Sequence, residues 1–155
     1  MKFEFLPLPP VVLGSHNDPA TVHTCAFVPT FDELISGETL ITNEAQIKHI
    51  WRRLFAAPYD SRFVDFEQDF VVLMGGGFLH PMYEFRISSV ELFEVTFETE
   101  FLETFVDSSL AIAGTTYLPG PPPPEMDPIP HLSAVRISRQ FLGNAVFSRL
   151  VNAAP

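Results

Sequence analysis

The sequence predicts an α+β domain in which a mostly antiparallel, curled or partly barrel-like β-sheet packs against one α-helix. Apolar and polar residues alternate with a period of two between residues 83 and 101, which is typical of strands with one buried face. The segment of about residues 42–55 instead shows the helical spacing of apolar side chains. A chain of 155 residues can bury its own core, so residues 1–155 are interpreted as a single domain.

The predicted helix begins after a capping residue, Thr42 or Asn43, and carries Glu44 in its first turn, where a carboxylate interacts favourably with the helix dipole. Pro58 stops the helix because proline cannot continue its backbone hydrogen bonding. The apolar stripe at positions i, i+3, i+4 and i+7 consists of Ile47, Ile50, Trp51 and Leu54.

Two segments give the clearest strand signals. A continuous apolar run over residues 70–74 predicts a strand buried on both faces, ending at glycines 75–77 in a hairpin with unusual backbone angles. The alternation of apolar and polar side chains over residues 93–101 predicts a strand with an apolar face toward the core and an acidic face toward solvent. The side chains expected on the apolar face include Phe93, Val95 and Phe97.

The other segments complete the predicted sheet. Most of the sixteen phenylalanines are expected inside it, because each carries a large apolar area. Residues 31–34 form either a short helix or a strand, and residues 119–130, with seven prolines in twelve positions, form a stiff extended loop. Further strands are expected at residues 3–5, 22–28, 39–41, 83–87, 110–118 and 135–137. Residues 141–151 form either a closing strand, which we favour, or a short helix.

The charge balance narrows the range of partners. Nine Lys and Arg face nineteen Asp and Glu, and no Lys or Arg occurs from Ser88 to Val135. Nucleic acids and anionic membranes both require clustered basic residues, so we expect neither as a partner. No apolar run approaches the length of a membrane-spanning helix, so no membrane insertion is expected. Met1 to Gly14 lacks the apolar region of a signal peptide, which predicts a cytoplasmic protein, or an extracytoplasmic one if an upstream leader is removed.

Catalytic, cofactor and metal motifs are not evident, and no residue is assigned to such a role. Cys25 is the sole cysteine and is interpreted as a small buried hydrophobe. The acidic group at residues 60–69 lacks the ligand order of a calcium loop, so Asp60 or Asp65 is expected to cap a turn. The glycines at 75–77 lack the lysine and helix start of a phosphate loop. Metal-ligand spacing is absent among His16, His23, His49, His80 and His131.

Protein interaction is the function that these features favour. The contact is expected at an exposed strand edge or at the loops Gly75–Pro81 and Pro119–Pro130. The carboxylates along the 93–101 strand either steer a basic partner or prevent the strand edge from pairing with other chains. The candidate interaction residues are Gly76, Phe78, His80, Tyr83, Glu94, Glu98 and Glu100.

A series of short motifs follows the predicted elements along residues 31–139. They are core and turn residues, and their order is more informative than any one of them. In chain order they are Ile41-Thr42 with Trp51, Val64-Asp65-Phe66, the apolar strand with its glycines at 70–77, the aromatic strand 83–87 with Val90, and Pro130 with Val135 and Ile137.

This order resembles the PrcB-like domain, named for a protein that associates with and stabilises a bacterial surface protease complex. The resemblance implies that the domain has an accessory role, binding another protein without catalysing a reaction. It also implies export, since members of the family are typically exported, often as lipoproteins. It does not name a partner for this chain.

Two other functions stay open from the sequence. The chain is alternatively a small-ligand-binding or hydrolytic domain that uses a cavity in the curled sheet, with His80, Asp65 or Tyr83 at its mouth. A convergence of two or more of these side chains in a deep pocket would favour that function. A third alternative, a structural subunit of a larger assembly, predicts a stable oligomer.

Overall fold

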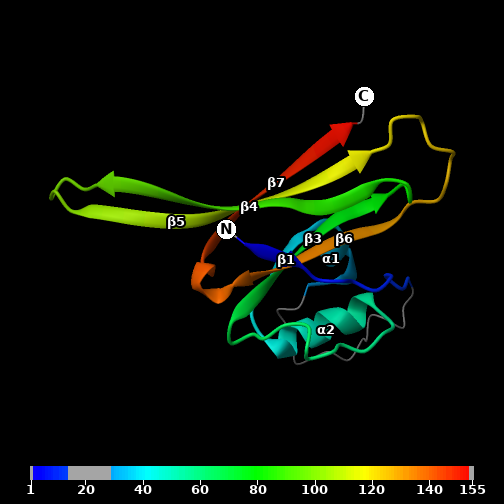
Figure 1. Ribbon diagram of the computed structural model, residues 1–155, viewed down its shortest axis with the longest axis horizontal. Coiled ribbons are helices and arrows are strands. Elements are labelled where there is room, and N and C mark those ends of the chain that lie inside the picture. Colours follow the sequence, from blue (N-terminus) through cyan, green and yellow to red (C-terminus); the bar gives the residue numbers. More distant parts are fainter. Residues whose placement is uncertain (1, 14–28, 154–155) are drawn as a thin grey trace.

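Seven strands form two sheets in the computed structural model, which describes residues 2–13 and 29–153 (Figure 1). The first sheet has the order β1-β6-β3-β2, and the second has the order β4-β5-β7. The sheets are not closed into a barrel, and the strands pair antiparallel except for β5 and β7. The predicted α+β class is therefore confirmed. The strands are β1 (Phe3–Phe5), β2 (Glu38–Ile41), β3 (Asp69–Leu79), β4 (Glu84–Glu98), β5 (Thr104–Leu118), β6 (Ile129–Ser138) and β7 (Asn144–Ala153).

Two helices cover one face of the first sheet (Figure 1). The predicted helix is confirmed as α2 (Glu44–Leu54), whose Asn43 side chain accepts a hydrogen bond from the Gln46 N–H at 2.8 Å. Residues 31–34, which the sequence predicted as either a helix or a strand, belong to a helix, α1 (Phe31–Ser36). The Thr30 hydroxyl caps it by accepting a hydrogen bond from the Glu33 N–H. These side-chain caps satisfy backbone donors that a helix start leaves free.

β3 separates two apolar cores. One core lies between the helices and the first sheet, and it includes Val71 and Leu73 of β3. The other lies between the two sheets, and it includes Phe70, Val72 and Met74. Successive residues of a strand point to opposite faces, so each core takes alternate side chains from the same segment. The prediction of a strand buried on both faces is confirmed.

The predicted end of this strand at the glycines is wrong, because β3 continues through them to Leu79. A bulge lies between Gly75 and Gly77 in the pairing with β6. A side chain at Gly75 would overlap the backbone of Ile35 in α1, and one at Gly76 would reach the Phe85 ring at 2.5 Å. Gly75 and Gly76 are therefore required by close packing along a strand rather than by a hairpin turn. The predicted unusual backbone angle is present at Gly77, whose φ is 87°.

The prediction that Phe93, Val95 and Phe97 face the core is also wrong. They lie on β4 as expected, but their exposed fractions are 41%, 48% and 47%. A bulge between Ile87 and Ser89 shifts the alternation, so that Val90 continues the core face after Ile87. The odd-numbered residues beyond it therefore lie on the opposite face of β4. The expectation that most phenylalanines are inside also fails, because among the described phenylalanines the fully buried ones are Phe55, Phe70 and Phe85.

The remaining strand predictions hold with shifted bounds. The predicted closing strand is β7, which follows a 3-10 turn at Arg139–Phe141. The Pro-rich loop is shorter than predicted because β6 already begins at Ile129. The strand predicted at 22–28, like Cys25, lies outside the described residues. Neither described helix has the length and apolar character needed to cross a bilayer.

Replacing Gly75 by alanine should destabilise the protein by about 2 kcal/mol or more, because the added methyl group overlaps the α1 backbone, which has no flexible end that can move aside. Urea denaturation followed by tryptophan fluorescence measures the change. The control is Gly143→Ala, where nothing lies within 4 Å of the added atom. Equal stability of the two variants would contradict the close packing of β3 on α1.

Candidate interaction surfaces

The seven predicted interaction residues fall into two groups at opposite ends of the β4–β5 hairpin. Gly76, Phe78, His80 and Tyr83 lie where β3 passes into β4, beside the Pro-rich loop. Glu94, Glu98 and Glu100 lie toward the tip of the hairpin. Figure 1 shows that this tip extends far beyond the two-sheet body on the side away from the Pro-rich loop. The two groups therefore cannot form one contact site.

At the loop end, His80 holds the Pro-rich loop against the β3–β4 turn. Its Nδ1 accepts a hydrogen bond from the Met82 N–H at 3.0 Å, so the ring proton lies on Nε2 and is donated to the Pro124 carbonyl at 2.5 Å. The His131 Nε2 donates in turn to the His80 carbonyl at 3.2 Å. The Tyr83 ring packs against the His80 ring with centroids 5.4 Å apart. These contacts give His80 a structural role.

The other two predicted residues at this end differ in accessibility. Gly76 is a packing position, since the Phe85 ring occupies the space where its side chain would be. Phe78 is exposed by 48%. Of Gly76 and Phe78, only the Phe78 side chain is thus available to a partner at the loop end, next to a β3–β4 turn that is held by its own hydrogen bonds.

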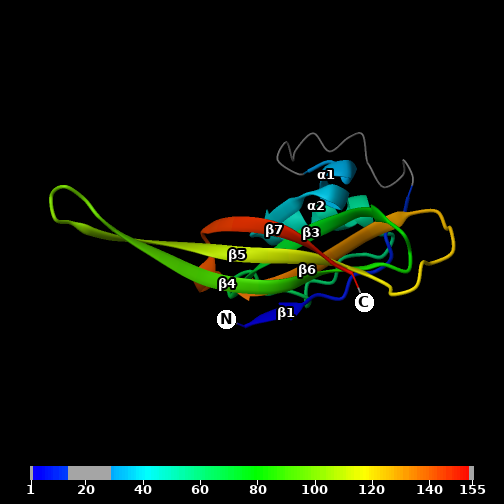
Figure 2. The same cartoon turned by 90° about the horizontal axis from the view of Figure 1, so that it is seen from above.

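At the other end, residues 91–107 form a protruding two-stranded segment, here called the hairpin arm (Figure 2). β7 pairs with β5 only from Ser109 onward, so residues 94–108 have no third described strand beside them. One face of the arm carries Phe93, Val95, Phe97 and Phe105, here called the aromatic face. Phe97 is paired directly with Phe105, and their ring centroids lie 6.5 Å apart. All four side chains are more than 40% exposed.

Carboxylates surround the aromatic face. Asp107 is paired with Val95 and so lies on that face, whereas Glu94 and Glu98 lie on the opposite face of the arm. No Lys or Arg occurs in the arm or in the rest of residues 87–135. The arm therefore combines an exposed apolar stripe with uniformly negative charge. The exposed acidic side chains are Glu91, Glu94, Glu98, Glu100, Glu103 and Asp107.

Sequence reasoning identified the acidic residues of the arm but missed its aromatic face. A usable signal was present in the partner strand. The segment paired with residues 93–98 is Thr104–Ser109, and it carries Asp107, Ser108 and Ser109 among its six residues. A strand this polar cannot line a core, so its partner strand cannot be buried either.

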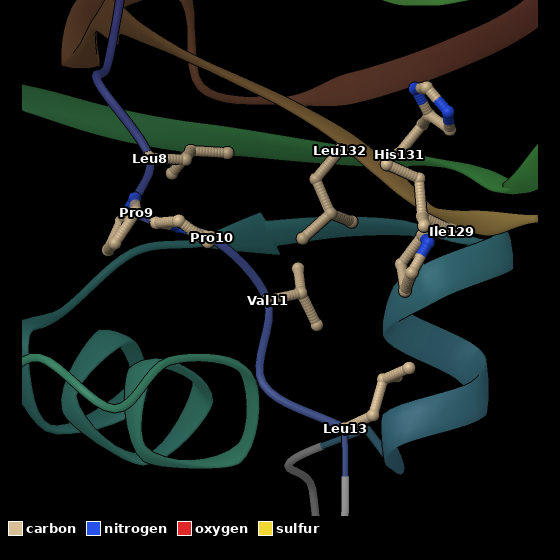
Figure 3. A pocket seen from close by; sticks show the side chains of 9 residues that line it. Leu8, Pro9, Pro10, Val11, Leu13, Ile129, His131 and Leu132 are labelled. Atoms are coloured by element: carbon tan, nitrogen blue, oxygen red, sulfur yellow. The ribbon is translucent and has the colours of Figure 1, made fainter. Parts of the chain in front are cut away.

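Two shallow grooves on the described surface show where the side chains expected at the mouth of a ligand pocket lie. The groove in Figure 3 has a volume of about 350 Å³ and lies between residues 8–13 and residues 129–132. Its lining is mostly aliphatic and prolyl, with His131 at its border. Asp65 lies in a different groove, with Arg139, and neither groove contains His80 or Tyr83. Among the described residues no group of three or more His, Cys, Asp or Glu is placed to hold a metal ion.

The acidic residues between α2 and β3 cap turns, as predicted. The Asp65 carboxylate accepts a hydrogen bond from the Glu67 N–H at 3.0 Å. The Asp60 carboxylate accepts from the Arg62 N–H at 2.9 Å and from the Arg62 guanidinium at 2.7 Å. These bonds lower the pKa of Asp60 to about 2. Burial raises the pKa of the nearby Tyr59 hydroxyl, with a smaller contribution from Glu44.

Comparison of the chain with protein-family models, with curated proteins and with solved structures yields no match. The resemblance to the PrcB-like domain therefore stays a prediction. The assignment of a function rests on the geometry of the surfaces described above.

Replacing His80 by alanine should loosen the Pro-rich loop, because the bond to the Pro124 carbonyl and the packing on Tyr83 are both lost. Cleavage after Glu125 by a glutamate-specific protease measures this, and we expect it to accelerate several-fold while the melting temperature changes by only a few degrees. The control is His49→Ala on α2. Unchanged cleavage at Glu125 would show that His80 does not hold the loop.

Proposed function

We propose that this chain is a non-catalytic protein-binding domain, an accessory module that docks on a partner protein through the hairpin arm. The observation that supports this most strongly is the aromatic face, on which Phe93, Val95, Phe97 and Phe105 all remain more than 40% exposed. Contiguous apolar side chains on a projecting element are typical of interaction sites. Scattered single apolar residues would carry no such implication.

The size of this face indicates what kind of contact it can make. Complete burial of one such side chain stabilises by about 1.5–3 kcal/mol, and these side chains are already about half covered, so covering all four would contribute about 3–6 kcal/mol. Association costs of several kcal/mol oppose this gain. The aromatic face alone would therefore give weak binding, and a further attraction is needed.

The carboxylates of the arm supply that attraction if the partner is basic. Glu91 and Asp107 border the aromatic face, and the arm carries no cation that would neutralise them. A second copy of the arm would bring like charges together, which opposes docking of arm on arm. The expected partner surface is thus an apolar patch bordered by Lys or Arg. An accessory role of this kind is also what the resemblance to the PrcB-like domain implies.

The test compares two variants of the arm in capture of proteins from the source extract at low salt. Phe97→Ser removes a ring from the aromatic face and should reduce recovery of the partner at least about tenfold, since it truncates a central apolar contact. Val106→Ser is the matched control, because Val106 is exposed to a similar degree but lies on the opposite face of the arm, paired with Thr96.

Both variants should unfold within about 0.5 kcal/mol of the unmodified chain, because both positions are on the surface. Raising the salt concentration from about 0.05 to about 0.5 M should release the partner by screening its charges. Capture of the same proteins by Phe97→Ser and by the unmodified chain would contradict the proposed site. Failure of the unmodified chain to capture any protein at low salt would contradict the proposed function.

A further inference from the structure

The outer edge of β7 is open within the part of the chain that the structure describes. β7 pairs with β5 on one side, and no other described strand pairs with it on the other (Figure 1). Its ten residues include no proline, glycine, lysine or carboxylate, and Arg149 is its only charged side chain. An edge of this length and composition lacks the features that normally prevent pairing with another chain.

The opposite edge of the same sheet, β4, is protected in several ways. It is interrupted by a bulge between Ile87 and Ser89, and the Ile87 N–H is taken by the Ser133 hydroxyl at 2.9 Å. It also carries four glutamates between Glu84 and Glu98, which would repel a similar edge. Only the β7 side of the second sheet is thus suited to extension by another strand.

We propose that β7 pairs antiparallel with β7 of a second copy of this chain, with Ser148 of both copies at the two-fold axis. The two three-stranded sheets then join into one sheet in the order β4-β5-β7-β7-β5-β4. This homodimer is independent of the proposed docking of the hairpin arm, which extends past the end of each sheet at which β7 begins (Figure 1).

The sequence of β7 is nearly palindromic about Ser148, and this selects the register. A two-fold axis normal to the sheet places residues of the same face opposite one another, so one residue must lie on the axis. With Ser148 there, apolar side chains meet apolar ones and Phe147 meets the Arg149 guanidinium, a favourable cation–aromatic pair. The resulting pairs are Asn144 with Asn152, Ala145 with Val151, Val146 with Leu150, and Phe147 with Arg149.

Neighbouring registers lack this complementarity. With Phe147 on the axis, Asn144 would face Leu150 and Ala145 would face Arg149. With Arg149 on the axis, the two guanidinium groups would lie directly opposite each other, which is destabilising. Ser148 is therefore the one position near the middle of the strand that suits the axis.

The charge of Arg149 does not oppose this contact, because it is already compensated within each copy. Its guanidinium donates to a Glu38 carboxylate oxygen at 3.1 Å and to the carbonyl oxygens of Gly75 at 2.5 Å and Ser36 at 3.1 Å. On the other face of β7, Val146 and Leu150 are exposed by 55% and 54%. In the dimer these four side chains, two from each copy, gather around the paired serines and lose exposed apolar area.

Disulfide trapping tests the register directly. In a chain carrying Cys25→Ser, the variant Ser148→Cys should form a covalent dimer under mild oxidation, because directly opposed residues of antiparallel strands lie within disulfide reach. Asn144→Cys in the same background is the matched control, since its partner across the axis is Asn152. Equal cross-linking of the two variants, or none in either, would overturn the proposed register.

Light scattering with size-exclusion chromatography tests the dimer without a covalent bond. The unmodified chain at tens of micromolar should have twice the monomer mass, and higher salt should not dissociate it, because screening weakens repulsion between two acidic chains. Leu150→Lys should give the monomer mass, whereas Thr96→Lys, which adds the same charge to the hairpin arm, should not. A monomeric unmodified chain, or a Leu150→Lys variant that remains dimeric, would overturn the proposal.

Discussion

Burial of β3 on both faces is the constraint on which the rest of the fold depends. Its side chains alternate between two cores, so helices must cover one face and a second sheet must cover the other. The close approach of α1 to Gly75 and of Phe85 to Gly76 follows from the same demand, because both layers pack directly on the strand backbone. The hairpin arm begins where this second layer runs past the end of the strand it covers (Figure 1).

The sequence was most informative where one residue pattern has one structural solution. Helical spacing with a capping Asn43 predicted α2 to within two residues at its start and one at its end. The unbroken apolar run from Phe70 predicted that β3 is covered on both sides. In both cases the local pattern and the tertiary packing require the same arrangement, so reading the pattern alone was sufficient.

The failures arose where the outcome depends on a partner distant in sequence. A single bulge at Ser88 exchanges the two faces of β4, and nothing local to Phe93 or Phe97 reveals it. Glycines 75–77 carry the composition of a turn, yet they lie within a strand, where α1 packs on Gly75 and the Phe85 ring packs on Gly76. The parallel pairing of β7 with β5 likewise depends on the crossover through the first sheet. The candidate surface was therefore half predicted: its acidic residues were found, and its aromatic face was not.

The end of β7 pairing at Ser109 has a mechanical consequence for the hairpin arm. From Ser109 to Leu118 the sheet has three strands and a packed face, whereas on the arm side of Ser109 only β4 and β5 remain paired. An isolated two-stranded ribbon is marginally stable in water. Such a ribbon bends and twists at low energetic cost, which lets it follow the contour of whatever it touches and stiffen upon contact.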